Sequence, residues 1–565
     1  MADLVIRNAH IVDGTGAPAY DGDITVDGDT ITSIDAPGSA PKGTREIDAD
    51  GQLVAPGWVD VHTHYDGQVT WDPEVSPSSW HGATTVVMGN CGVGFAPVRH
   101  EEKSLLIELM ESVEDIPGTA LHEGIDWQWE SFPEYLDALE AMPRVLDIAA
   151  QVPHAALRAY VMGNRAHDDD ATHEDVAMMA KLTAEAVDAG AVGFSTSRTV
   201  LHRSKYGLVP GTTAPGDEVV AIGEAMGKVG KGVIQIISDR SGHDGPERQW
   251  MVELARSTGR PLTFLMAQAP HQPEGYRDVL AHAQQLQDEG VMFVPQVGNR
   301  PTGMLFGLQS SLHPFISHRT YRSIADLPLA ERVAKLRTGE VRDALLNEES
   351  GANPMAAALM SRWDQMFPLG DPPNYEPPRE ASVGATAERE GRRPQEVALD
   401  WLLERDGKAL FFAPLASYVH YNFDAIREMV SHPATMLGLS DGGAHCGLVC
   451  DASMTTFNLT HWARDRSRGE TLPLEFIVQQ QTQRTASIYG FNDRGVLKPG
   501  KRADMNVIDF DGLTLHAPEM IFDLPAGGRR LVQYVDGYSA TLCAGQVTYV
   551  DGEATGDRPG RLVRA

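Results

Sequence analysis

Eight short apolar runs, most of them followed by a stretch with helical periodicity, recur along the middle of the chain. They cover residues 58–61, 84–88, 145–150, 191–194, 232–237, 261–266, 291–294 and 436–439. Apolar runs of this length are typical of strands buried on both faces, and their alternation with helices indicates a parallel sheet. Eight such units predict an α/β fold, a (β/α)8 TIM-like barrel whose active site lies at the carboxyl ends of the strands. An open doubly wound sheet is the alternative, but the glycine-rich phosphate turn that usually follows its first strand is absent.

Both ends of the chain show a different pattern, in which short strands alternate with turn signals. The expected strands are Leu4–Asn8, a hairpin over Ile24–Ile34, Asp504–Asp509, Leu531–Val535 and Ala544–Gly552. The Asp-Gly and Gly-Asp pairs at residues 27–29 fit a hairpin turn. We expect residues 1–55 and 491–565 to meet and form one small β-sandwich domain beside a catalytic barrel over residues 56–490.

Two long insertions interrupt the strand and helix alternation. One covers about residues 98–143, after the second strand, and the other covers residues 299–432, after the seventh. Both leave the catalytic end of the barrel, so each can form a wall or lid over the substrate, because long ordered loops are more often functional than idle. For the second insertion, a contact between subunits of a homo-oligomer is an equal alternative.

Charge and cysteine content narrow the classes of partner. The 565 residues carry 47 basic and 78 acidic side chains, a net charge of −31, which disfavours nucleic acid and anionic membrane surfaces as partners. Four cysteines are too few for a disulfide scaffold, and the chain starts without a basic segment followed by an apolar stretch. No apolar run approaches the roughly 20 residues that span a bilayer. We expect a cytoplasmic protein, a homo-oligomer, that acts on a small molecule.

Two histidines mark the end of the first predicted barrel strand. His62 and His64 lie two residues apart, so in an extended strand their side chains point to the same side. Asp441 follows the eighth apolar run. Two imidazole nitrogens and a carboxylate oxygen suit Zn²⁺ with an open position for water. The alternative is that the two histidines cap an edge strand by hydrogen bonding.

Several segments together resemble the amidohydrolase superfamily and, within it, the N-acyl-D-amino-acid deacylases, the D-aminoacylase family. They are Leu4–Ala9 with Val12–Gly16, Ala55–Asp66, Gly89–Gly92, Gly193–Thr196, Ser440–Gly442 and Gly495–Asp504. The His-x-His segment and the late Gly-x-Leu-x-Pro-Gly-x-x-Ala-Asp segment are superfamily markers, whereas Asn90-Cys91-Gly92 points to the deacylase branch. The resemblance spans nearly the whole chain.

The resemblance implies roles for particular residues. Asp441 corresponds to the catalytic general base, which takes the proton of a zinc-bound water and passes it to the leaving amine. Cys91, at the end of the second strand, corresponds to a metal ligand, so that the metal ligands become His62, His64, Cys91 and Asp441. The alternative for a lone cysteine is a small buried hydrophobe, which is what we expect of Cys446 and Cys450.

The sequence departs from the family pattern at the fifth and sixth strands. Neither strand end carries the histidine of deacylases with two metal positions, and the fourth strand has no lysine that could bridge two ions. We therefore favour one Zn²⁺ per chain. Two ions remain the alternative, since His243 and His271 lie beyond these strand ends, and Glu114 and Asp115 are then the first further ligands to consider.

Substrate-binding groups are expected just beyond the strand ends. The candidates are Asp239, Arg240, His202, Arg203, Asn299 and Arg300. An arginine can hold a substrate carboxylate with two parallel hydrogen bonds, so we place Arg240 first. Each of these residues taken singly is more often a surface or structural residue.

These observations predict a zinc-dependent hydrolase of carbon–nitrogen bonds other than peptide bonds, acting on the linear amide of an N-acyl-(D-)amino acid. Cyclic amides, carbamates and esters are the alternative substrates. The remaining alternative is a non-catalytic scaffold of the same fold. We expect substrate choice to reside in the two insertions and the loop after the fifth strand, with the acidic and aromatic segment Glu114–Phe132 near the rim.

Overall fold

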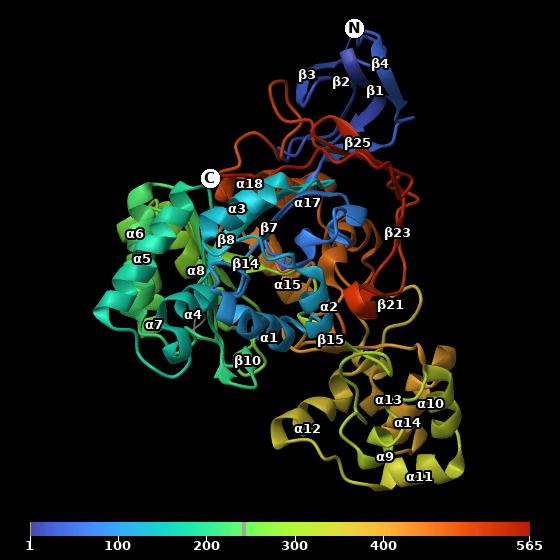
Figure 1. Ribbon diagram of the computed structural model, residues 1–565. Helices are drawn as coiled ribbons and strands as arrows, with labels where there is room; N and C mark the ends of the chain where they lie inside the picture. The colour runs from blue at the N-terminus through green and yellow to red at the C-terminus, as the bar shows by residue number, and fades with distance from the viewer. Residues whose placement is uncertain (1, 240–244) are drawn as a thin grey trace.

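The computed structural model describes residues 2–239 and 245–565, and its centre is an eight-stranded parallel sheet (Figure 1). The strands, in their order along the sheet, are β6 (Trp58–Asp60), β7 (Ala83–Met88), β8 (Asp147–Pro153), β9 (Gly193–Arg198), β12 (Val233–Ser238), β13 (Leu262–Leu265), β14 (Phe293–Val297) and β18 (Met436–Leu437). Each strand overlaps one of the eight predicted runs. The TIM-like α/β fold predicted from the sequence is therefore confirmed.

The first and eighth strands meet at their carboxyl ends. The Asp441 amide donates to the His62 carbonyl at 3.1 Å, and the His64 amide donates to the Gly442 carbonyl at 2.7 Å. A parallel bridge also joins Thr63 to Gly442. These bonds curl the sheet, so that side chains following β6 and β18 face one another.

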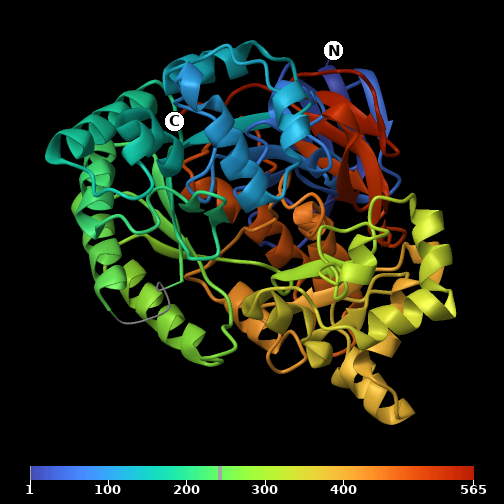
Figure 2. The ribbon, with the colours of Figure 1, turned by 60° about the horizontal axis from the view of Figure 1, so that its bottom comes forward.

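Helices cover the outside of the sheet and form an arc around it in Figure 2. They include α4 (His154–Met162), α5 (His173–Asp188), α6 (Gly216–Val229), α7 (Pro246–Thr258) and α8 (Gly275–Asp288). In α6, Val219, Ile222 and Met226 are buried at helical spacing. That helix ends at Gly230, whose φ of +80° is a left-handed conformation that glycine adopts without strain.

Strands from both termini form one mixed sheet, as expected from their turn-rich pattern. Its strands are β1 (Ala2–Ile11), β2 (Tyr20–Asp27), β3 (Thr30–Asp35), β4 (Gly43–Asp48), β5 (Leu53–Pro56), β19 (Met505–Ile508), β24 (Tyr538–Cys543), β25 (Gln546–Val550) and β26 (Glu553–Ala554). The two ends join where β5 pairs antiparallel with β19, with Val54 opposite Val507. The predicted strand Leu531–Val535 lies elsewhere, because β22 (Gly528–Val532) pairs with β21 (Glu519–Leu524) in a separate hairpin.

The two insertions differ in how they pack. The first contributes α1 (Lys103–Glu114), α2 (Gly118–Gly124) and α3 (Phe132–Ala141), whose apolar side chains join the main core. The second forms a unit with its own apolar core, around Phe306, Leu336 and Leu402. Its helices are α9 (Arg319–Arg322), α10 (Leu329–Leu336), α11 (Gly339–Asn347), α12 (Pro354–Met360), α13 (Val383–Glu390) and α14 (Pro394–Leu402), and its strands are β15 (Gly303–Phe306), β16 (Phe367–Pro368) and β17 (Phe411–Pro414). Figure 1 shows these helices grouped to one side of the barrel.

The segment after β18 returns along the barrel through α16 (Met454–Phe457), a π-helix (Asn458–Asp465), α17 (Leu474–Gln479), a second π-helix (Gln480–Arg484) and α18 (Thr485–Ile488). Within residues 2–239 and 245–565, no helix combines the length and the apolar character needed to cross a membrane.

Candidate metal centre

His62 and His64 follow β6 into the centre of the barrel, where each is about 1% exposed. The His62 Nδ1 atom lies 2.8 Å from the Gln296 Oε1 atom of β14. Because a carbonyl oxygen only accepts, Nδ1 carries the proton and Nε2 keeps its lone pair free for a ligand bond. Burial lowers the pKa of His62 to about 4, so its ring is neutral at pH 7.

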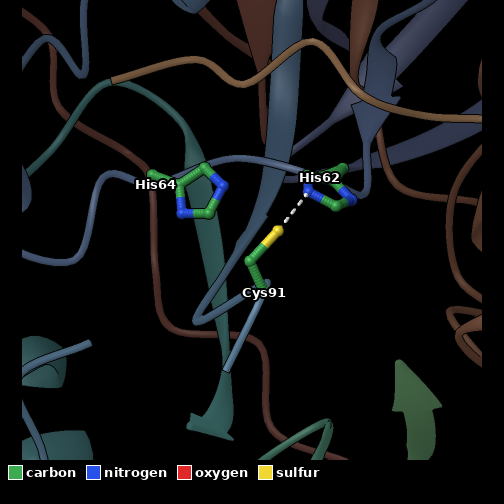
Figure 3. A group of neighbouring side chains, drawn as sticks. All are labelled: His62, His64 and Cys91. Carbon is green, nitrogen blue, oxygen red and sulfur yellow. Dashed lines mark hydrogen bonds between the residues drawn. The ribbon is translucent and has the colours of Figure 1, made fainter. Parts of the chain in front are cut away.

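Cys91 reaches the same point from the end of β7. Its Sγ atom lies 3.3 Å from the His62 Nε2 atom (Figure 3). The Cys91 backbone has a φ of +54°, and its amide donates to Gln235 Oε1 at 3.0 Å. Close packing requires glycine two residues before it, because a Cβ on Gly89 would stand 2.3 Å from the Gln151 carbonyl oxygen.

The donor atoms of His62, His64 and Cys91 all lie within 4.8 Å of one another, and no other such group of three occurs in the described part of the chain. Ligands at zinc bond lengths in a tetrahedral arrangement stand roughly 3.3–3.6 Å apart. The observed spacings around His62 Nε2, 3.3 Å to Cys91 and 3.4 Å to Asp441 Oδ1, match that range. Burial raises the pKa of the Cys91 thiol, and a bound cation opposes this rise by favouring the thiolate. The donor set therefore fits a metal ion.

Asp441 lies in the loop after β18, whereas Cys91 follows β7. The strand that leads to the two histidines, β6, lies between these two strands. The Asp441 Oδ1 atom lies 3.7 Å from His64 Nε2, and the Asp441 backbone φ of +48° is strained for a non-glycine residue. Burial raises the pKa of Asp441 to about 6, although the neighbouring His445 lowers it. A carboxyl group with such a pKa can accept and release a proton near neutral pH.

Glu114 and His445 belong to this centre but are absent from the predicted ligand set. Glu114 ends α1 and is about 1% exposed. Its Oε1 atom lies 3.5 Å from His64 Nδ1, and its Oε2 atom lies 3.5 Å from His445 Nε2. Burial raises the pKa of Glu114 well above its usual value, with Asp441 and Asp66 adding to the rise. The sequence suggested Glu114 only as a further ligand if two ions bind. No sequence signal indicated which strand end its side chain would reach.

Of the predicted substrate groups, His202 interacts electrostatically with the residues of this centre. It is half-buried, with its Nδ1 atom 2.9 Å from Ser197 Oγ. Burial lowers the pKa of His202 to about 3, and His445 and His62 add to this lowering, which places all three rings in one electrostatic neighbourhood.

The other candidates are scattered. Asp239 Oδ2 accepts a 2.8 Å hydrogen bond from the Val200 amide, which ties the end of β12 to the loop after β9. Arg203 is exposed in the short strand β10 (Arg203–Ser204), and Arg240 lies outside the described residues.

Arg300 and Asn299 are buried in the interior of the protein. The Arg300 guanidinium donates to Asp451 Oδ1 and to the Cys450 carbonyl at 2.6 Å, and it stacks on the Tyr375 ring at 4.3 Å. Asn299 donates to the Met454 carbonyl at 2.6 Å. These contacts hold both residues against the segment after β18, while Arg300 Nη1 and Asn299 Oδ1 have no hydrogen-bond partner within the described residues. The substrate-binding role of either residue stays a prediction.

The departure from the family pattern at the fifth and sixth strands is visible in the structure. β12 carries Gln235, whose Oε1 atom accepts from the Cys91 amide, and the sixth strand leads to Gln268, whose backbone amide donates to the Ser417 hydroxyl oxygen at 3.1 Å. His271 is exposed beyond the end of β13, and His243 falls outside the described residues. Within the described residues, neither strand end brings an imidazole to the centre.

Comparison with known proteins gives similar chains over the full length. A family model described as the amidohydrolase family matches residues 45–549. The N-acyl-D-aspartate deacylase of Alcaligenes xylosoxydans xylosoxydans is 27% identical over 100% of this chain and 95% of its own length. The D-aminoacylase of the same organism is also 27% identical, over 90% of this chain and 88% of its own.

Solved structures give the same fold. A crystal structure of D-aminoacylase superposes over 100% of both chains with a TM-score of 0.66 at 21% identity. The N-acyl-D-glutamate deacylase of Bordetella bronchiseptica, complexed with zinc and a phosphonate inhibitor, covers 100% of both chains with a TM-score of 0.65 at 24% identity. At these identities the likeness establishes the shared architecture of barrel and terminal sheet.

Proposed function

The chain belongs to the amidohydrolase family, and on that premise we propose that it is a zinc-dependent hydrolase that removes the acyl group from N-acyl-D-amino acids. The observation that carries the proposal is the convergence of His62, His64 and Cys91, with Asp441 beside them, at the carboxyl ends of β6, β7 and β18. Full-length similarity to two deacylases of N-acyl-D-amino acids supports this choice of reaction.

The residues that would hold one Zn²⁺ are His62, His64, Cys91 and Asp441. When bound, the ion lowers the pKa of a water molecule toward 7, roughly, and polarises the substrate carbonyl. Gln296 fixes the tautomer of His62, which keeps its Nε2 lone pair directed at the site. One ion is the simplest occupancy, because β12 and β13 bring no imidazole to the centre within the described residues.

Asp441 is the proposed proton carrier. With a pKa near 6 its side chain is mostly a carboxylate at neutral pH, ready to take a proton from water. The same group can then deliver that proton to the leaving amine, since its Oδ1 atom faces both histidines across 3.4 and 3.7 Å. Its loop is held by the Asp441 amide bond to the His62 carbonyl and by Ser440, which donates to Asp60.

Substrate recognition is assigned to the rim. An N-acyl amino acid presents a carboxylate, and Arg240 at the end of the fifth strand remains the first choice to bind it. His202 offers a neutral ring beside the metal ligands and can contact the substrate as a hydrogen-bond donor or acceptor. The first insertion can supply an apolar wall beside the substrate through α1 and α2, whose apolar side chains belong to the main core.

The test combines metal analysis with a paired substrate screen. Purified protein, loaded with zinc or stripped with a chelator, is assayed on N-acetyl derivatives of D-aspartate, D-glutamate, D-leucine and D-methionine, with each L-enantiomer as the matched control. We expect about one zinc per chain and hydrolysis of D-substrates that disappears on stripping. Hydrolysis confined to cyclic amides, carbamates or esters would contradict the deacylase assignment while retaining metal-dependent hydrolysis. A protein that binds no divalent metal would contradict the whole proposal.

A further inference from the structure

We propose that Glu114 is a positioning residue of the metal centre, which holds His64 with one carboxylate oxygen and His445 with the other. The first insertion would then be an essential part of the centre as well as a wall beside it. This inference rests on the proposed metal dependence, but it concerns a residue outside the ligand set.

The first argument is the burial of unpartnered polar atoms. Both Glu114 oxygens and the His64 Nδ1 atom are buried and lack a hydrogen-bond partner within the described residues. Buried polar groups are nearly always hydrogen-bonded, because leaving one unpaired is costly. The His64 Nδ1 atom faces Glu114 Oε1 across 3.5 Å, and His445 Nε2 faces Glu114 Oε2 across 3.5 Å, so a shift of a few tenths of an ångström pairs each carboxylate oxygen with its histidine.

The second argument is the orientation of the His64 ring. Its Nε2 atom lies 3.7 Å from Asp441 Oδ1, and Figure 3 shows one ring nitrogen turned toward His62 and Cys91. The other nitrogen, Nδ1, therefore points at Glu114. A metal-binding histidine usually donates its second N–H to a carboxylate or carbonyl, which fixes the tautomer and the ring orientation. Gln296 does this for His62 at 2.8 Å, and Glu114 occupies the equivalent position for His64.

The third argument is the way in which the end of α1 is fixed in place. The His445 amide donates to the Glu114 carbonyl, and the Gly447 amide donates to Asp115 Oδ2 at 2.9 Å. Ser311, from the second insertion, donates to the same Asp115 carboxylate at 2.8 Å. Asp115 and His445 both have positive φ, 50° and 51°. Both insertions and the loop after β18 thus meet at the end of α1, where Asp115 follows Glu114.

Local physics opposes an acidic residue at this position. A carboxylate at the carboxyl end of a helix meets the negative end of the helix dipole, and Glu114 is also buried. Residues that break local preferences in this way are expected at functional sites. His445 supplies the second donor, with a side chain that is 26% exposed, so it connects Glu114 to the outer edge of the centre.

The experiment measures zinc affinity without substrate. Wild type, Glu114→Gln and Glu111→Gln are titrated with zinc against a chromophoric chelator, and the cobalt-substituted proteins are compared by visible absorption. Glu111 lies on the same helix but is exposed and accepts from the Gly118 amide, so it is the matched control. We expect zinc affinity to fall by about 10- to 100-fold and the cobalt bands to shift in Glu114→Gln alone.

His445→Gln provides the second readout, because a partly exposed side chain can be replaced with little effect on folding. We expect a loss of zinc affinity smaller than that of Glu114→Gln, since the His64 contact remains. If Glu114→Gln does not fold, an unchanged zinc affinity in His445→Gln and in Glu114→Asp overturns the inference.

Three results separate the possible failures. A folded Glu114→Gln protein with zinc affinity within twofold of wild type overturns the positioning role. Loss of one of two bound zinc ions in that variant also overturns it, because Glu114 is then a ligand. A wild-type protein that binds no zinc contradicts the proposed function itself.

Discussion

The two ends of the barrel hold buried charges in opposite ways. At the amino-terminal end of the strands, the Asp147 carboxylate accepts hydrogen bonds from Arg494 at 2.7 Å, from Arg502 at 3.0 Å and from the Arg561 amide at 2.8 Å. At the carboxyl-terminal end, Glu114 and His64 Nδ1 have no hydrogen-bond partner in the described part of the chain. Positive φ at Cys91, Asp441 and His445 adds backbone strain there.

This difference separates stability from chemistry. At the amino-terminal end Arg494 and Arg502 each have an acidic partner, and the same cluster ties the C-terminal segment and the terminal sheet to β8. The carboxyl-terminal end leaves polar atoms of Glu114 and His64 unpaired, which lowers the free energy of unfolding until a ligand pairs with them. In barrels of this kind the carboxyl ends of the strands carry function and the opposite face carries stability. Substitutions at the two ends should therefore affect different measurements.

The largest effect is expected from Asp441→Asn, which keeps the side-chain shape and removes the proton acceptor. Loss of general-base help lowers the turnover rate by roughly 100- to 10,000-fold. Thermal unfolding of the metal-free protein should stay near the wild-type temperature, because a buried charge is removed. Initial rates with an N-acyl-D-amino acid, together with a melting curve, test both statements. Activity within a few-fold of wild type would assign proton transfer to another group.

Asp147→Ala should give the reverse result. Removal of this buried carboxylate leaves Arg494 and Arg502 short of a partner, at a cost of about 3–5 kcal/mol in the free energy of unfolding. Urea unfolding measures that loss, while zinc content and turnover per folded molecule should remain at the wild-type level. Asp493→Asn, half exposed beside the same Arg494, is the control and should cost less than about 1 kcal/mol. Loss of zinc in Asp147→Ala would show that the two ends are coupled.

A smaller effect is expected at the rim. Arg240→Ala should raise KM for a carboxylate-bearing substrate by roughly 10- to 150-fold, since a charged hydrogen bond contributes about 1.5–3 kcal/mol. Zinc content should not change. The exposed Arg256 of α7, changed to Ala, is the control with little expected effect. An unchanged KM in Arg240→Ala, with activity on a neutral amide or ester, would favour the alternative substrates.

The smallest effect is a pH dependence of kcat/KM, which we expect to arise only from the carboxyl-terminal end of the barrel. Asp441 has a raised pKa of about 6, so its carboxylate, the active form, increases as pH rises through that value. A bound cation favours the carboxylate and moves the transition below pH 6. We therefore expect kcat/KM to be level above pH 6 and to fall at lower pH, measured between pH 4 and 8. A fall that begins above pH 7 would not belong to Asp441.

The insertions show where sequence patterns stop being informative. Their positions after the second and seventh strands were predicted, but packing gave them different roles. The first buries its helices against the barrel and brings Glu114 to His64, whereas the second builds a core of its own. Arg300 illustrates the same limit: the sequence shows only that this arginine follows a strand, and the structure shows that it is buried against Asp451 and Tyr375.

The sequence by itself determined the eight strands, the pairing of the two termini and the candidate ligands His62, His64, Cys91 and Asp441. These follow from short-range rules: apolar runs bury, a spacing of two puts side chains on one side, and parallel strands end at one edge. Only the tertiary structure decided that Glu114 and His445 join them, and that Arg300 is buried against Asp451 and Tyr375. The physical reason is that loop conformation and helix docking depend on contacts between segments hundreds of residues apart, such as the bond from the His445 amide to the Glu114 carbonyl, which no local pattern encodes.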